Sequence, residues 1–400
     1  MTELTQAAVR GLLIAAQGLQ QQKPRKVTEK TVREIIRQMH VLQIDTISVV
    51  ARSPYFVLWS RLGDYEPKWL DHLLEKGALF EYWSHAACFL PIEDFAYYWL
   101  GMMERGSTDN GWQKWLQEHQ EVAERVMDYV RENGNVRSSD FERTDGLKGG
   151  WWNRKDEKIA LEALFNGGQL MIRKRHNFQR IYDLRERVLP DWDETQAATK
   201  EQIHEQFVLN TIKALGVTKA EWIADYFRLK KADTLKALKI LEQEDKVGRI
   251  EVEGWTTPGY FHFDNEAMVM AATKGKIPQS KTTLLSPFDP IVWDRQRASE
   301  LFNFDYKIEV YTPAPKRKYG YFTLPILYNN QLIGRLDPKA HRKEGIFEVR
   351  AVHLEPGAEV DDAMVASLKE TIKACADWHK TPQVVVRSAN VPGLAEQLAD

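Results

Sequence analysis

Two polar side chains that could handle a water molecule, Gln43 and Asp45, lie two residues apart in the segment Leu42-Gln43-Ile44-Asp45-Thr46-Ile47. The alternation of apolar and polar residues predicts an extended segment, with Leu42, Ile44 and Thr46 on one side and Gln43 and Asp45 on the other. A carboxamide and a carboxylate so placed could hold one water molecule between them. The same residues support a second interpretation, in which Asp45 caps the N-terminus of a following helix.

Three other polar side chains stand among large apolar neighbours. Glu81 and His85 fall in the run Phe80–Pro91, and Asp289 precedes Pro290 in the run Leu285–Arg295. Each could line a cleft. A histidine in an apolar run is also typical of a core or boundary residue, and Asp before Pro is typical of a turn. The residues alone leave both interpretations open.

Basic residues gather at three predicted turns, although the formal net charge of the chain is only −2. The clusters are Arg173-Lys174-Arg175-His176, Lys316-Arg317-Lys318, and Lys339 with His341-Arg342-Lys343. Each cluster by itself is typical of a solvated loop. Together on one concave face, they would follow the phosphates of a nucleic acid. Any nucleic-acid surface on this chain therefore has to be local.

Several classes of function lack support in the sequence. There is no P-loop, Rossmann glycine fingerprint, HExxH helix or CxxC pair, so nucleotide hydrolysis, dinucleotide redox chemistry and zinc hydrolysis have no motif. The two cysteines, Cys88 and Cys375, lie far apart and indicate small buried residues of a reducing compartment. No secretory signal and no bilayer-spanning apolar run is present. We expect a cytosolic protein without a metal or a cofactor.

Helical periodicity predicts what positions Gln43 and Asp45. Apolar residues recur at helical spacing in Thr31–Met39, so a helix should deliver the polar pair. Residues 117–184 predict helices followed by a hairpin at Leu170–Leu184. Residues 201–263 repeat that order, with hairpin strands at Gly248–Glu253 and Tyr260–Phe263. Helices followed by a terminal hairpin are the order of a winged helix.

The last part of the chain is β-rich, with strands expected at Thr282–Leu285, Tyr306–Tyr311, Gly320–Leu327, Gln331–Leu336 and Ile346–Leu354. A helix over Asp361–His379 should pack on them. The expected fold class is α+β, with tandem winged-helix motifs and a C-terminal antiparallel β-rich, barrel-like domain. The expected domains are a winged-helix-like unit over 1–116, winged helices over 117–198 and 199–276, and the β-rich domain with its terminal helix over 277–400.

Five stretches, in order along essentially the whole chain, resemble the bacterial YcaQ-like DNA glycosylases, relatives of AlkZ. They are Leu42-Gln43-Ile44-Asp45-Thr46-Ile47, Ala51-Arg52-Ser53-Pro54-Tyr55, Glu81-Tyr82-Trp83, Leu285-Ser286-Pro287-Phe288-Asp289-Pro290 with Trp293-Asp294-Arg295, and Tyr311-Thr312-Pro313-Ala314-Pro315-Lys316-Arg317. The resemblance implies a C-shaped scaffold of tandem winged-helix motifs around duplex DNA. It also implies removal of alkylated purines, chiefly N7-alkylguanine, and unhooking of interstrand crosslinks.

The catalytic motif of that family is Gln, an apolar residue, then Gln or Asp. Gln43-Ile44-Asp45 matches the Asp form of the crosslink-repair branch and departs from the two-glutamine form of the self-resistance enzymes. The resemblance therefore implies that Asp45 stabilises an oxocarbenium-like sugar and activates a water that Gln43 holds. No lysine accompanies the pair, so lyase activity is not expected.

The expected partner is double-stranded DNA with alkylated or crosslinked bases, bound by a monomeric, cytoplasmic and nucleoid-associated enzyme. The expected DNA-binding residues are Arg52, Arg173, Lys174, Arg175, Lys316, Arg317, Lys318, His341 and Arg342. Trp151-Trp152 is either a wedge between base pairs or a buried pair. The rival hypotheses are a non-enzymatic winged-helix regulator and a damage-binding protein without turnover. Against the regulator, such proteins commonly carry one winged unit and dimerise on palindromes.

Overall fold

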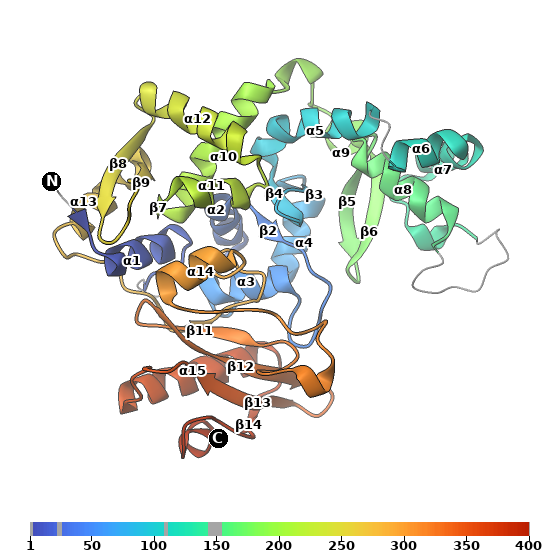
Figure 1. Ribbon diagram of the computed structural model, residues 1–400. Helices are drawn as coiled ribbons and strands as arrows, with labels where there is room; N and C mark the ends of the chain where they lie inside the picture. Colours follow the sequence, from blue (N-terminus) through green and yellow to red (C-terminus); the bar gives the residue numbers. More distant parts are fainter. Residues whose placement is uncertain (1–2, 22–25, 108–110, 143–153, 400) are drawn as a thin grey trace. The chain divides into compact units, whose positions relative to one another are not determined.

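The chain is a mixed α+β protein, as the sequence predicts (Figure 1). The computed structural model describes residues 3–21, 26–107, 111–142 and 154–399. It divides into two compact units. The first contains residues 1–67, 84–86 and 207–400, and the second contains residues 68–83 and 87–206. This division is coarser than the four expected domains, whose boundaries remain a prediction.

The N-terminal part of the first unit contains β1 (Glu3–Leu4), α1 (Gln6–Ala16), α2 (Glu29–Met39), β2 (Leu42–Gln43) and α3 (Ser53–Leu62). Helix α2 begins with a reciprocal cap, because the Thr28 side chain accepts the Thr31 amide and the Thr31 side chain accepts the Thr28 amide. The apolar residues of α2 that were expected to face inward are all buried: Val32, Ile35, Ile36 and Met39. The predicted helix is therefore confirmed.

A second group of elements, which belongs to the first unit from Phe207 onward, runs from α10 (Lys200–Leu215) through β7 (Val217–Thr218), α11 (Ala220–Tyr226), α12 (Lys231–Gln243), β8 (Val247–Val252) and β9 (Gly259–His262) to α13 (Glu266–Ala272). Its core includes Ile212, Ile223, Leu238 and Leu241. Leu235, in contrast, is 54% exposed on α12. Strand β1 pairs in parallel with β8, so the start of the chain completes a sheet of order β1-β8-β9-β7.

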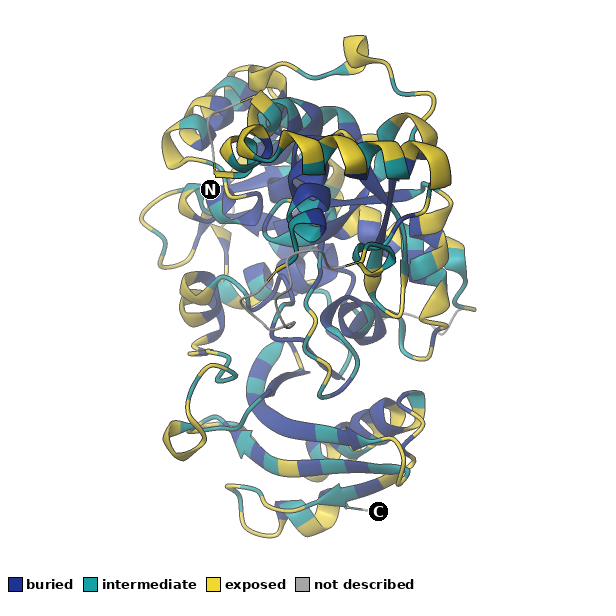
Figure 2. Ribbon diagram, turned by 90° about the vertical axis from the view of Figure 1, so that its right-hand side faces the viewer, coloured by how far each residue is buried: buried dark blue, intermediate teal, exposed yellow. Residues whose placement is uncertain are grey.

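The C-terminal part of the first unit is a five-stranded sheet of order β10-β11-β12-β13-β14. Its strands are β10 (Thr283–Leu284), β11 (Leu324–Tyr328), β12 (Gln331–His341), β13 (Ile346–Leu354) and β14 (Gln383–Val386). The helices of this part are α14 (Arg295–Phe302), α15 (Asp362–Trp378) and α16 (Leu394–Leu398). Buried and part-exposed residues alternate along β13. Figure 2 shows strands with such alternating colours at the lower end of the view, near the C-terminus. The inward residues of this sheet and of α15 form one core.

Two predictions for this β-rich part need correction. Tyr306–Tyr311 is not a strand. Phe304 and Tyr306 are buried and alternate with exposed Asp305 and Lys307, but the segment joins no ladder. The sheet is also not wholly antiparallel, since β14 pairs in parallel with β13 after the long connection through α15.

The second unit contains the helices α4 (Lys68–Glu75), α5 (Phe95–Ser107), α6 (Gly111–Glu118), α7 (Gln120–Asn133), α8 (Asp156–Asn166) and α9 (Arg185–Val188). Its strands are β3 (Leu79–Trp83), β4 (Ala87–Pro91), β5 (Leu170–His176) and β6 (Gln179–Leu184). The predicted hairpin at 170–184 is confirmed as β5 and β6. Its turn has positive φ at Asn177 (49°) and Phe178 (66°), the backbone of a tight hairpin.

Candidate active site

The segment that carries Gln43 and Asp45 follows α2, which ends at His40 in a left-handed conformation with φ 61°. Leu42 and Ile44 are buried, whereas Gln43 and Asp45 are half-buried. The predicted alternation is therefore present through Asp45. It stops at Thr46, which is exposed. The apolar side anchors the segment and leaves the amide and the carboxyl group on its more accessible side.

The carboxyl group of Asp45 is held by a short backbone turn. Its Oδ1 accepts the amide of Ile47 at 2.8 Å, an Asx turn. No helix begins there, because the next helix is α3 at Ser53, so the alternative interpretation of Asp45 as a helix cap is wrong. Within the described part of the chain, no hydrogen bond reaches Oδ2. Burial raises the pKa of Asp45 from its ordinary 3.8, and the Ile47 hydrogen bond opposes that shift.

The loop after Asp45 is attached to the C-terminal sheet and helix of the same unit. The Ala340 amide on β12 donates to the Val49 carbonyl at 3.3 Å. The Ala51 amide donates to Nε2 of His379 at 2.9 Å. His379 lies just after α15, is 6% exposed, and its Nδ1 donates to the Cys375 carbonyl at 2.7 Å. Sequence reasoning did not identify His379, since nothing in its neighbourhood indicates a partner more than three hundred residues away.

His379 is a neutral imidazole with one fixed tautomer. Nε2 must be unprotonated to accept the Ala51 amide, and Nδ1 must carry the hydrogen that reaches Cys375. Burial and, to a smaller extent, the charge of Arg342 together lower the pKa of His379 to about 4, although its hydrogen bond to Cys375 opposes the shift. The aromatic rings of Phe56, Phe347 and Trp378 surround it. The loop that carries Asp45 is thus fixed at its far end by a rigid, uncharged acceptor.

Two of the expected DNA-binding residues lie close together beside this loop. Arg52 immediately precedes α3. The pKa of Arg342, on the β12–β13 turn, is lowered mainly by burial and also by the positive charge of Arg52. Two guanidinium groups whose charges repel each other would both be stabilised by a phosphate. His341, the neighbour of Arg342, instead pairs with Glu348 at 3.0 Å.

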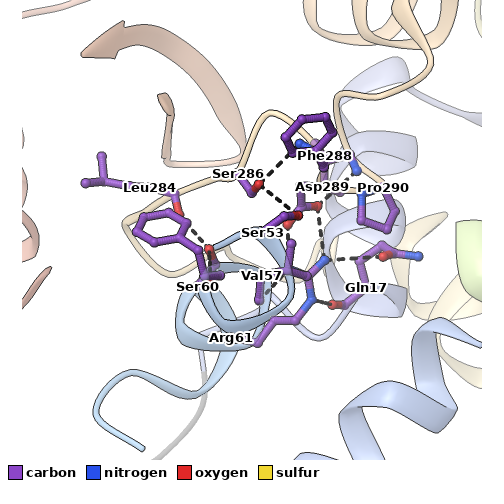
Figure 3. A network of polar contacts seen from close by, with 12 residues as sticks. Gln17, Ser53, Val57, Ser60, Arg61, Leu284, Ser286, Phe288, Asp289 and Pro290 are labelled. Atoms are coloured by element: carbon purple, nitrogen blue, oxygen red, sulfur yellow. Dashed lines mark hydrogen bonds and ion pairs between the residues drawn. The ribbon is translucent and has the colours of Figure 1, made fainter. Parts of the chain in front are cut away.

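Asp289 is sealed inside the first unit and does not line a cleft. It is 0% exposed and forms a bidentate ion pair with Arg61 of α3, at 2.6 and 3.1 Å (Figure 3). Arg61 also donates to the Gln17 carbonyl, the Gln17 side chain and the Val57 carbonyl, so all five of its N–H groups are used. The Ile291 amide donates to Asp289 Oδ1, which confirms the turn.

The same network joins two of the stretches that carry the family resemblance. The hydroxyl groups of Ser53 and Ser286 lie 3.3 Å apart, and Ser60 donates to the Leu284 carbonyl at 2.6 Å. Figure 3 shows these side chains directed at one another from α3 and from the segment that follows β10. These stretches hold α3 and therefore the end of the Asp45 loop. Their role is to position the site.

In the second unit, Glu81 is a buried structural carboxylate. It accepts Arg175 through both oxygens at 2.8 Å and Arg180 at 2.6 Å. The two arginines hold the pKa of Glu81 below its ordinary value in spite of burial, which raises it. The Arg175 side chain is only 6% exposed. Its prediction as a DNA-binding residue needs correction, because its charge is neutralised inside the unit.

His85, in the first unit, is also structural. Its ring stacks on Trp293 with centroids 3.9 Å apart, and its Nε2 accepts a hydrogen bond from Arg228 at 3.0 Å. Burial lowers the pKa of His85 to about 4, and the charge of Arg228 contributes to that shift. The imidazole is therefore neutral, and of the two interpretations the core or boundary residue is the one that fits.

The remaining predicted contacts are distributed over both units. In the second unit, Arg173 is half-buried and Lys174 pairs with Glu75 at 2.8 Å. In the first unit, Lys316, Arg317 and Lys318 lie on the loop before β11, where Arg317 donates to the Thr312 carbonyl at 2.9 Å. Trp151-Trp152 lies outside the described residues.

Gln43 and Asp45 lie outside the cavity that the structure shows in the first unit. A cavity of about 520 Å³ lies elsewhere in the first unit, with Trp59, Lys281 and Ser367 among its lining residues, and neither Gln43 nor Asp45 borders it. Among residues 3–21, 26–107, 111–142 and 154–399, no group of three or more His, Cys, Asp or Glu side chains could hold a metal ion. In the same ranges, no helix is long and apolar enough to cross a membrane.

Comparison with known proteins identifies the family of this site. The family model described as "DNA glycosylase AlkZ-like" matches residues 36–378, most of the chain. The chain belongs to the AlkZ-like DNA glycosylase family. Among solved structures, the Streptomyces sahachiroi DNA glycosylase AlkZ has a similar fold, with a TM-score of 0.61 and 14% sequence identity over 96% of this chain and 100% of that one.

Membership in this family makes the protein an enzyme that acts on the glycosyl bonds of DNA, with DNA as its substrate. The expected family is confirmed, and a purely regulatory winged-helix protein is no longer a rival. The matched residues include the whole of Gln43-Ile44-Asp45 and the loop up to α3. They end at residue 378, just before His379.

Proposed function

We propose that this enzyme is a monofunctional DNA glycosylase that hydrolyses the N-glycosidic bond of N7-alkylguanine and related alkylpurines. We also propose that it unhooks interstrand crosslinks joined through such bases. Asp45 and Gln43 are its catalytic residues. The observation that carries the proposal is the half-buried carboxyl group of Asp45, which has one oxygen fixed by Ile47 and the other without a protein hydrogen bond in the described chain.

The chemistry follows from the substrate. An N7-alkylguanine is already cationic, so it departs as a neutral base and needs little general acid. As the bond between C1′ and N9 breaks, positive charge develops on the sugar, as in glycoside hydrolysis. The Asp45 carboxylate stabilises that charge and takes a proton from the attacking water, whose oxygen forms the new bond to C1′. The products are the free base and an abasic site.

Gln43 has the supporting role. It lies two residues before Asp45 on the same side of an extended segment whose opposite side is buried through Leu42 and Ile44. Its carboxamide offers both a donor and an acceptor, so it can orient the water without changing charge. Loss of Gln43 should therefore slow the reaction less than loss of the Asp45 carboxylate.

An accessible site also suits a crosslinked substrate. A base that is tethered to the opposite strand cannot swing freely into an enclosed pocket. Gln43 and Asp45 are half-buried and not sealed in a core, which supports catalysis in an open groove. Arg52 and Arg342, beside the Asp45 loop, would bind phosphates near the lesion.

The DNA-binding scaffold that we propose uses winged helices. In the first unit, α10, β7, α11, α12, β8 and β9 follow one another in the order of a winged helix. In the second unit, α7 and α8 precede the β5–β6 hairpin. We propose that Arg173, Lys174, Lys316, Arg317, Lys318 and His341 contribute further phosphate contacts and that the enzyme acts as a monomer.

The direct test is excision from a duplex that contains a single N7-methylguanine. Base release, and abasic sites that alkali cleaves, should appear with the wild type and should be absent from the same duplex with unmodified guanine. A second duplex with a crosslink through N7 of guanine should separate into single strands on a denaturing gel. Tight binding of the methylated duplex without release of the base contradicts the proposed activity.

A further inference from the structure

Tyr311 is the most exposed large apolar or aromatic side chain among the described residues, at 90% of its full accessibility. It lies in the Tyr311 loop, which we define as residues 307–320, between a buried segment at Phe304 and Tyr306 and the strand β11. Burial of an aromatic ring of this size is normally favourable. The exposed ring is therefore available to a binding partner.

The Tyr311 loop is fixed by a carboxylate in spite of its exposure. Glu309 accepts the amides of Lys318 and Tyr319 at 2.8 Å and of Gly320 at 3.2 Å. These three hydrogen bonds hold the pKa of Glu309 below its ordinary value although burial raises it. Arg317 closes the loop from the other side by donating to the Thr312 carbonyl. The ring of Tyr311 thus projects from a loop whose first and last segments are joined by hydrogen bonds.

The base of the loop rests on β12. Arg335 is 1% exposed, and its guanidinium group lies 4.3 Å from the centre of the Phe304 ring and 4.2 Å from the centre of the Tyr319 ring. It therefore contacts the segments before and after the loop. Asp337, two residues further along β12, accepts the Phe322 amide at 3.3 Å. Gly320 has φ 138°, and a Cβ there would meet Asp337 at 2.4 Å, so this contact requires glycine.

The same strand also holds the Asp45 loop. Ala340, which donates to the Val49 carbonyl, follows Asp337 by three residues on β12. Three residues of a strand span about 10 Å, and three base pairs of DNA span the same distance. The supports of the Tyr311 loop and of the Asp45 loop are therefore close enough to serve one DNA duplex.

The charges on the loop match a nucleic acid. Lys307, Lys316 and Lys318 are exposed, and the ammonium group of Lys318 lies 4.7 Å from the centre of the Tyr319 ring. Residues 307–320 contain four cationic side chains, those of Lys307, Lys316, Arg317 and Lys318, and one carboxylate, that of Glu309, so the net charge of the loop is positive. A rigid exposed ring flanked by cations is the arrangement with which proteins stack on unpaired bases.

We propose that Tyr311 stacks on a base of the bound DNA, at or beside the damaged nucleotide, while Lys316 and Lys318 contact the flanking phosphates. The identity of the damaged base rests on the proposed function. The stacking contact itself does not depend on that identity. Tyr311 fills the role of wedge for which the sequence had offered Trp151-Trp152. It makes no contact with the reacting atoms and acts by holding the opened duplex.

The test uses a duplex with a tetrahydrofuran abasic analogue, which cannot be hydrolysed, and 2-aminopurine opposite it. Tyr311→Ala should bind this duplex roughly 5- to 150-fold more weakly than the wild type, the equivalent of about 1–3 kcal/mol of stacking per base. The wild type should change the 2-aminopurine fluorescence and Tyr311→Ala should not, whereas Tyr311→Trp should restore both. Val360→Ala, at a residue that is 42% exposed, is the surface control.

Salt dependence separates stacking from charge. Tyr311→Ala should leave the slope of log affinity against log salt unchanged, whereas Lys316→Ala should make it shallower by about one. Affinity of Tyr311→Ala within twofold of the wild type would overturn the inference. Because the tetrahydrofuran analogue is not hydrolysed, the binding test of Tyr311 does not depend on the proposed glycosylase activity. Each of the two proposals can therefore be refuted without the other. Failure of the wild type to excise N7-methylguanine leaves the stacking result intact, and normal excision with normal binding by Tyr311→Ala refutes only the stacking.

Discussion

Replacement of His379 tests whether the Asp45 loop is positioned by a neutral imidazole. In His379→Gln, the side-chain oxygen can take the place of Nε2 and accept the Ala51 amide, but it does not titrate. In His379→Leu, the volume is nearly kept and the acceptor is lost, which leaves a buried amide unsatisfied at about 1–3 kcal/mol. Comparison of these two variants separates the contribution of the hydrogen bond from that of packing against Phe56, Phe347 and Trp378.

The magnitude follows from the pKa of His379. In the folded protein it is lowered to about 4 from 6.5, so below pH 6.5 the unfolded chain takes up a proton that the folded chain does not. This favours unfolding, and the stability that depends on neutral His379 is complete above pH 6.5 and is lost as the pH falls toward 4. Over the whole window the loss is about 3 kcal/mol, and from pH 6.5 to pH 5 it is about 2 kcal/mol.

The assay is urea denaturation of the wild type and of His379→Gln at pH 7 and at pH 5. The free energy of unfolding of the wild type should fall, relative to that of the variant, by about 2 kcal/mol between the two pH values. His85, whose pKa is also about 4, is present in both proteins and cancels from the difference. A difference that does not change with pH would refute the assignment of a neutral, buried His379.

His379 should also have a catalytic readout that stability alone does not produce. At pH 7, His379→Gln should excise N7-methylguanine nearly as fast as the wild type under single-turnover conditions, because the Ala51 amide keeps an acceptor. His379→Leu should have a lower maximal rate at unchanged DNA affinity, because the Asp45 loop loses its anchor. Equal rates for the two variants would show that the hydrogen bond does not position the loop.

Two further predictions concern charges in the first unit. Arg342→Ala should weaken binding to any duplex and make the slope of log affinity against log salt shallower by about one. Fluorescence anisotropy from about 50 to 200 mM salt measures this slope. An unchanged slope would show that Arg342 does not contact DNA. Asp289→Asn should lower the free energy of unfolding by about 3–5 kcal/mol, because it leaves Arg61 buried without its carboxylate, and a loss below 1 kcal/mol in thermal or urea unfolding would contradict that role.

The features that could be predicted from the sequence are those that local patterns determine. The helix over Thr31–Met39 and the hairpin at 170–184 follow from apolar spacing and from turn residues, so their positions are nearly correct. The alternation at Gln43 and Asp45 is also local, and it correctly predicted which of the two sides is buried.

The features that could not be predicted depend on partners far along the chain. Alternation in Tyr306–Tyr311 predicted a strand, but Phe304 and Tyr306 are buried at Arg335 and the segment joins no ladder. Arg175 belongs to a basic run, yet its charge is neutralised by Glu81, 94 positions earlier. No local pattern specifies such pairs, because burial and charge type limit the possible partners without selecting one.

The carboxylate of Asp45 can be tested with one measurement, the single-turnover rate of N7-methylguanine excision by Asp45→Asn. Asparagine keeps the acceptor for the Ile47 amide and the shape of the loop, and it removes only the charge. Because burial raises the pKa of Asp45, removal of the charge should leave the protein at least as stable at pH 7, while the rate falls roughly 10²- to 10⁴-fold. A stable Asp45→Asn protein that excises the base at the wild-type rate would contradict a catalytic role for this carboxylate.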